Sequence, residues 1–153
     1  MPFSLGIIEG IGSITTWYLF FFFDAMKAAK ITYWISTIAL ALFILPGLFF
    51  MNSPEAVEGM AKVGLTSAVW LQQLVWFGAP LAILLILIPG VWNRLKEWSY
   101  VGIGCIYIGA FWAHISIDGL ANPMTYAPVV AFAILLTSYL AWHKILKARG
   151  ETL

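Results

Sequence analysis

A histidine and an aspartate four residues apart are the clearest candidates for chemistry in this sequence. His114 and Asp118 fall at the end of a long apolar run. Residues i and i+4 of a helix share a face, so the carboxylate can accept a hydrogen bond from the imidazole and fix its tautomer. Such a pair can exchange a proton or hold a polar head group such as a quinone carbonyl. The same spacing is equally consistent with a structural contact that only caps the end of the helix.

Three further polar residues are candidate ligand-binding residues together with His114: Glu58, Gln72 and Gln73. Glu58 follows another apolar run, but with Lys62 it also forms the i,i+4 ion pair typical of a short solvated helix, and this interpretation is favoured. One of the two glutamines is expected to face the protein interior, because an amide that faces lipid has no partner. These residues place the predicted pocket at one end of the molecule.

The sequence lacks the residue sets that an independent enzyme needs. It contains no nucleophile–histidine–acid set, no glycine-rich phosphate loop and no carboxylate cluster for two metals. The single cysteine, Cys105, excludes an internal disulfide and Cys-x-x-Cys chemistry. His114 and His143 are expected at opposite ends of the molecule, so they cannot ligate one b-type haem. We therefore predict no metal site and no cofactor held by the chain alone, while a quinone, a lipid or a pigment can bind. An enzymatic activity is left open, and a non-catalytic role is favoured.

The composition indicates that these residues are carried by membrane helices. The sequence is 62% hydrophobic and 10% charged, with a mean hydropathy of +0.93 and a net charge of +1. A soluble domain carries about a quarter of its residues charged, and a nucleic-acid-binding protein needs a basic surface. A membrane-spanning helix needs about 20 mostly apolar residues. Four segments reach that length, and apart from Lys144 near the end of the last they contain no Lys, Arg, Asp or Glu: 31–51, 66–88, 98–117 and 126–146.

Basic residues predict the orientation of this four-helix transmembrane bundle. All but one of the eight Lys and Arg residues fall on one side: Lys27, Lys30, Arg94, Lys96, Lys144, Lys147 and Arg149. The other side carries only Lys62, together with Glu55, Glu58 and Asp118. Loops rich in Lys and Arg stay on the cytoplasmic side. We therefore expect a multi-pass all-α protein with a cytoplasmic C-terminus and the His114 pocket at the outer end.

The sequence divides into a hydrophobic N-terminal arm (1–26), the bundle (27–149) and a short cytoplasmic tail (150–153). Segment 3–23 is apolar enough to enter a bilayer, although Glu9 and several glycines weaken its first half. It either forms a fifth span with the N-terminus outside or lies along the cytoplasmic interface. Its aromatic residues are expected to contact lipid or a partner subunit: Trp17, Phe20, Phe21, Phe22 and Phe23.

Small residues and prolines predict how the spans pack. Small side chains recur along the third span and are expected to let a neighbouring backbone approach closely: Gly102, Cys105, Gly109 and Ala113. Pro46 and Pro80 interrupt the first and second spans, and each frees a backbone carbonyl one turn earlier. We expect a kink at each proline, and the less favoured alternative is that the freed carbonyl lines a cavity.

From about Lys27 to Lys147, four-fifths of the chain, the sequence resembles the DoxX-like family of small four-helix membrane proteins. The matching pieces, in order, are Tyr33-Trp34-Ile35-Ser36-Thr37, then Ser53-Pro54-Glu55-Ala56-Val57-Glu58-Gly59, then Arg94-Leu95-Lys96-Glu97-Trp98-Ser99-Tyr100-Val101-Gly102, and finally His114 followed by Asp118-Gly119.

The resemblance implies a four-helix bundle in a bacterial cytoplasmic membrane and an association with quinone-linked redox systems. Two features depart from the family pattern. Many members carry a charged residue deep in the second span, whereas stretch 77–81 here has none. The arm, 1–26, is an addition to the family core, and a hydrophobic extension of this kind suits docking onto a larger membrane assembly.

Three functional classes follow. The favoured one is an accessory subunit of a larger membrane complex, associated with quinone-linked redox chemistry, whose partners are other membrane subunits and lipids. The alternative is an oxidoreductase membrane subunit that binds a quinone or lipid at His114 and Asp118. A small transporter is the weakest, because no span carries an ionisable residue at mid-depth and no inverted repeat is visible.

Overall fold

The computed structural model describes residues 5–50, 53–62 and 72–151, with side chains from residue 24 onward, and these residues form helices joined by turns. Three helices are long: α1 (Leu5–Ile44), α6 (Asn93–Asp118) and α7 (Ala127–Arg149). The others are α2 (Gly47–Phe50), α3 (Pro54–Lys62), the π-helical turn η2 (Leu74–Gly78), α5 (Ala79–Leu87) and the 3-10 turn η3 (Pro123–Tyr126).

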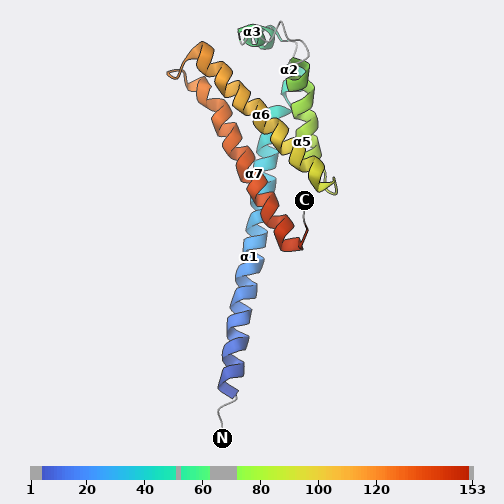
Figure 1. The fold of residues 1–153 in the computed structure, drawn as a ribbon, viewed down its shortest axis with the longest axis vertical. Helices are drawn as coiled ribbons and strands as arrows, with labels where there is room; N and C mark the ends of the chain where they lie inside the picture. Colours follow the sequence, from blue (N-terminus) through green and yellow to red (C-terminus); the bar gives the residue numbers. More distant parts are fainter. Residues whose placement is uncertain (1–4, 51–52, 63–71, 152–153) are drawn as a thin grey trace.

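The helices form a bundle in which each main element has two neighbours. The C-terminal half of α1 packs against α7, α7 packs against α6, α6 packs against α5, and α5 packs back against α1 (Figure 1). Three stretches are long and apolar enough to cross a membrane: Asp24–Phe50, Asn93–Asp118 and Pro123–Arg149. The described residues are thus helical throughout apart from turns, and the protein is a multi-pass membrane protein. Part of the predicted second span, 66–71, lies outside the described residues, so the count of four spans stays a prediction.

The predicted N-terminal arm and the first span form one continuous helix. α1 runs for 40 residues without a break, which corresponds to a length of roughly 60 Å at the α-helical rise. Figure 1 shows its blue N-terminal half extending away from the other helices. The backbone continues as one helix through residues 24–30, where the predicted arm meets the predicted first span. The placement of the arm relative to a bilayer stays a prediction.

Both prolines distort their helices, as expected from the sequence. α1 ends at Ile44, Pro46 lies in the turn that follows, and α2 restarts the helix at Gly47. Pro80 follows the π-helical turn η2, which widens the helix at the residues whose carbonyls a proline ring would otherwise meet.

A polar network joins three helices within the apolar core. Leu40, Ile83 and Ile103 are almost completely buried. Among them, Thr37 of α1 and Ser138 of α7 are 0% exposed, and their hydroxyl oxygens are 2.7 Å apart. The hydroxyl of Tyr100 on α6 lies 2.8 Å from the Ser138 hydroxyl. Since polar contacts replace the hydrophobic driving force between membrane helices, this network fixes the register of α1, α6 and α7.

Candidate functional site

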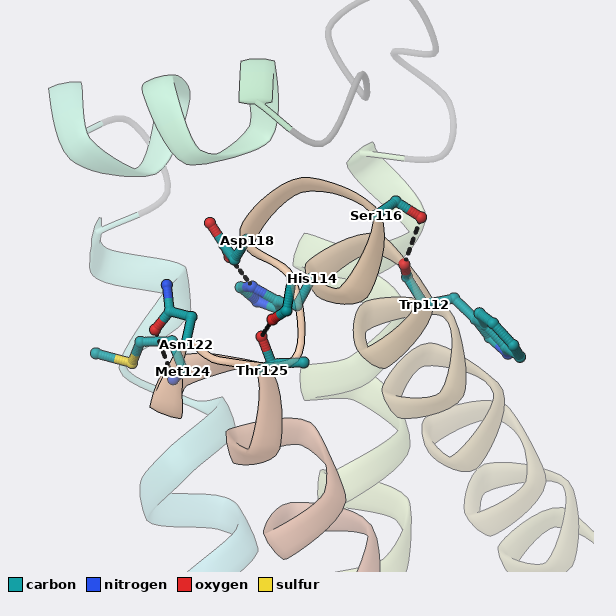
Figure 2. Close-up of polar contacts among 8 residues, drawn as sticks. Trp112, His114, Ser116, Asp118, Asn122, Met124 and Thr125 are labelled. Carbon is teal, nitrogen blue, oxygen red and sulfur yellow. Dashed lines mark hydrogen bonds and ion pairs between the residues drawn. The ribbon is translucent and has the colours of Figure 1, made fainter.

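The turn between α6 and α7 positions the end of α6. Gly119 has a φ of +72°, a conformation that side-chain-bearing residues rarely adopt, and it ends the helix directly after Asp118. The buried Thr125 hydroxyl donates to the Gly119 carbonyl at 2.8 Å. Asn122 caps η3 by accepting from the Met124 amide at 3.0 Å. These bonds, drawn in Figure 2, hold the turn in one conformation.

His114 and Asp118 form the predicted pair at this end. His114 Nδ1 lies 2.7 Å from Asp118 Oδ2, and the two side chains are 35% and 30% exposed. Figure 2 shows the imidazole and the carboxylate facing each other below α3. A carboxylate at this distance selects the tautomer with hydrogen on Nδ1. Nε2 is then the ring nitrogen left for a ligand: it accepts from a hydroxyl when the ring is neutral and donates to a carbonyl when the ring is protonated.

An apolar cavity of about 720 Å³ ends at His114. Its walls come from three parts of the chain: one face of α6, the η2–α5 segment and α3. The lining of α6 consists largely of small side chains, among them Gly102, Cys105 and Gly109. Cavities of roughly 300–1,000 Å³, mainly apolar with a few polar groups, are typical of small-molecule sites. The arrangement can hold an apolar body with a polar group at His114.

The small-residue face of α6, predicted to pack against a neighbouring backbone, borders the cavity in the part of the structure that is described. Among the described residues, a Cβ atom added to Gly102 or Gly109 would meet no atom within 4 Å. The glycine that does pack closely is Gly104, on another face, against Phe132 and Leu135. The pattern of small residues cannot distinguish a closely packed interface from a cavity wall, because both require small side chains.

The other predicted ligand-binding residues do not line this cavity. Glu58 forms the expected exposed pair with Lys62 at 2.8 Å. The ammonium of Lys62 lowers the pKa of Glu58 through this hydrogen bond and its charge. Gln72 is partly buried and Gln73 is exposed, and neither belongs to the cavity lining. α3 instead contributes Ala56, Gly59 and Met60.

The predicted contact residues of the arm cannot be placed in the same way. Trp17 and Phe20, Phe21, Phe22 and Phe23 fall on α1 where side chains lie outside the described part of the structure.

A second group of titratable residues lies at the opposite end of the bundle and was missed from the sequence. The Tyr139 hydroxyl donates to Glu97 Oε1 at 2.5 Å, and His143 Nε2 lies 3.4 Å from Glu97 Oε2. The Tyr139 and His143 rings are 4.3 Å apart. Tyr139 and His143 share an i,i+4 spacing on α7, but Glu97 is distant in sequence. The spacing alone could have indicated the tyrosine–histidine pair, and only the packing of α6 on α7 brings in the carboxylate.

Within the part of the chain that the structure describes, no three His, Cys, Asp or Glu residues gather in a way that could hold a metal ion. His114 lies near the α3 end of α6, and His143 lies beside Glu97 at the other end of the bundle.

Comparison with known proteins adds a family. Neither the curated proteins nor the solved structures include a significant match to this chain. The sequence model of the DoxX-like family matches residues 34–138, which extend from the first span to the buried Ser138 and include the His114–Asp118 pair. The match covers more than half of the chain, and the chain therefore belongs to the DoxX-like family.

Proposed function

We propose that this protein is a non-catalytic subunit of a membrane redox assembly that holds a quinone, or a similar lipid-soluble carrier, in the cavity ending at His114. The observation that supports this function is the apolar cavity of about 720 Å³ with one oriented imidazole at its end. A quinone matches this arrangement, because it combines an apolar body with a ring carbonyl, which becomes a hydroxyl in the quinol.

Asp118 has a defined role in this proposal. By accepting from Nδ1, it keeps Nε2 free for the head group of the carrier. His114 then binds the hydroxyl of a quinol in its neutral form and the carbonyl of a quinone in its protonated form. The imidazole positions the carrier, and electrons come from partner subunits.

The long helix α1 favours a subunit over an isolated protein. Its 40 residues are about twice the number needed to cross the hydrocarbon core, and its N-terminal half extends beyond the bundle (Figure 1). The sequence of that half is apolar. An apolar helix extending from a small bundle is expected to pack against another membrane subunit.

Cys105 offers a direct test of carrier binding. It is the only cysteine in the sequence, it is exposed, and it lines the cavity. We expect a fully substituted benzoquinone, which cannot add the thiol to its ring, to slow the labelling of Cys105 by N-ethylmaleimide in lipid–detergent micelles. A quinone at saturating concentration that leaves the labelling rate unchanged would contradict the proposal.

Two variants separate the head-group contact from the cavity volume. His114→Ala removes one hydrogen bond, so the half-protecting quinone concentration should rise roughly tenfold. Gly109→Leu fills the cavity and should abolish protection, each variant being compared with its own rate without quinone. Ala133→Leu is the control, because Ala133 is exposed on α7 and does not line the cavity. Equal protection of wild type and His114→Ala would remove the role of the histidine.

A further inference from the structure

A second cavity, with charged residues in its lining, lies at the opposite end of the bundle, where most of the basic residues gather. It has a volume of about 440 Å³ and is bounded by the N-terminal part of α6, the C-terminal end of α7 and the middle of α1. Its charged lining residues are Lys30, Lys96 and Arg149, with Glu151 as the one carboxylate. Three cations and one anion give the lining of this cavity a net positive charge.

Lys96 is the cation of this cavity whose burial is energetically unfavourable. It is only 7% exposed, and no carboxylate among the described side chains forms an ion pair with it. Its ammonium donates to the Ile86 carbonyl at 3.0 Å, and the Tyr33 hydroxyl donates to the same oxygen at 2.7 Å. An ammonium has three donors, so one bond to an already satisfied carbonyl does not explain a buried charge.

The other charged groups leave room for an external anion. Lys30 forms no ion pair with a described carboxylate, and Arg149 meets Glu151 only at 3.8 Å, with both side chains about half exposed. The first turn of α6 adds to the positive potential, since it contains no acidic residue and its N-cap, Trp92, provides no side-chain hydrogen bond.

Exposed tryptophans indicate the depth of the cavity. Trp34 and Trp92 both line it, and both have exposed indoles. Tryptophan is enriched at the level of lipid headgroups, and basic pockets between membrane helices bind anionic headgroups there. We infer that this cavity, lined by Lys30, Lys96 and Arg149, binds a phosphate group, with an anionic phospholipid of the surrounding membrane as its source.

Lipid titration of the purified full-length protein tests this inference. Native mass spectrometry should show one phosphatidylglycerol molecule retained at concentrations where phosphatidylcholine is lost. The double variant Lys30→Gln/Arg149→Gln should weaken phosphatidylglycerol binding about tenfold or more. Lys27→Gln/Lys147→Gln is the matched control, because both lysines are exposed residues of the same two helices and neither lines the cavity.

Further arms separate the sources of the phosphate group. Phosphatidylglycerol that raises the unfolding temperature of wild type, but not of the double variant, supports the lipid source. If inorganic phosphate raises the unfolding temperature of wild type but not of the double variant, relative to chloride at equal ionic strength, the source of the phosphate group is a soluble phosphate. Equal loss of binding in the double variant and in its control, or no response to either probe, overturns the inference. Lys96→Gln, which keeps a donor for Ile86, should also lose affinity, and if it does not fold the double variant still decides the question.

Discussion

Ser138 holds the centre of the buried polar network, and its replacement by alanine should destabilise the bundle strongly for so small a change. The substitution removes the partner of Thr37 at 2.7 Å and of Tyr100 at 2.8 Å. Thr37 keeps its bond to the Tyr33 carbonyl at 2.6 Å, but the buried Tyr100 hydroxyl loses its partner. Interhelical hydrogen bonds in membranes contribute about 0.6 kcal/mol each on average, and stranding a buried polar group costs roughly 1–3 kcal/mol. We expect Ser138→Ala to lower the free energy of unfolding by about 2 kcal/mol.

Reversible unfolding of the purified protein by sodium dodecyl sulfate in mixed micelles, followed by tryptophan fluorescence, measures this loss. Thr137→Ala is a matched control on the same helix, since the exposed Thr137 hydroxyl bonds only the Ala133 carbonyl of its own helix. That variant should stay within about 0.5 kcal/mol of wild type. A Ser138→Ala protein no less stable than Thr137→Ala would show that this network does not join the helices.

Three further predictions concern the α3 end and the topology. Thr125→Val removes a buried side-chain bond to the α6–α7 turn and should lower the free energy of unfolding by about 1 kcal/mol in the same assay; an unchanged value would show that the turn does not depend on it. Lys62→Gln should raise the pKa of Glu58 towards its ordinary value, because the ammonium that favours the carboxylate is lost; carboxyl carbon NMR against pH measures this, and a static pKa would contradict the pairing. In a Cys105→Ala background, a membrane-impermeant maleimide should label Glu58→Cys on intact cells and Lys147→Cys only after lysis; the reverse pattern would invert the predicted orientation.

Much of the helical framework could be predicted from the sequence because hydrocarbon imposes a minimum length on apolar segments. The predicted third and fourth spans correspond to α6 and α7, although α6 begins earlier, at Asn93, since a helix continues past the apolar core into polar surroundings. Pro46 lies at a break between α1 and α2 and Pro80 directly follows a π-helical turn, because the lack of an N–H is a local property of proline. The continuity of α1 was not predicted, because charged residues such as Lys27 resemble a boundary in the sequence and yet fit easily on an exposed helix.

The candidate sites were predictable only where both partners share a helix. His114 and Asp118 meet because the i,i+4 spacing alone brings them together. The Thr37–Ser138–Tyr100 network and the bond from Tyr139 to Glu97 depend on which helices are neighbours, and sequence periodicity does not determine that. In the sequence, Lys96 indicates only the orientation of the bundle, because no local pattern shows that the C-terminal end of α5 covers its side chain.

The exposed face of α6 determines the route by which an apolar ligand reaches the cavity. Gly102, Cys105 and Gly109 are exposed on the side of the helix that borders the cavity. A molecule dissolved among the acyl chains would enter the cavity laterally from the bilayer, without crossing the headgroup region on either side. Its supply would then depend on how strongly it partitions from water into the bilayer. A cavity that is open to the bilayer and forms one hydrogen bond with its ligand would stay occupied by a strongly partitioning ligand. It would also release that ligand directly to a neighbouring protein in the same leaflet.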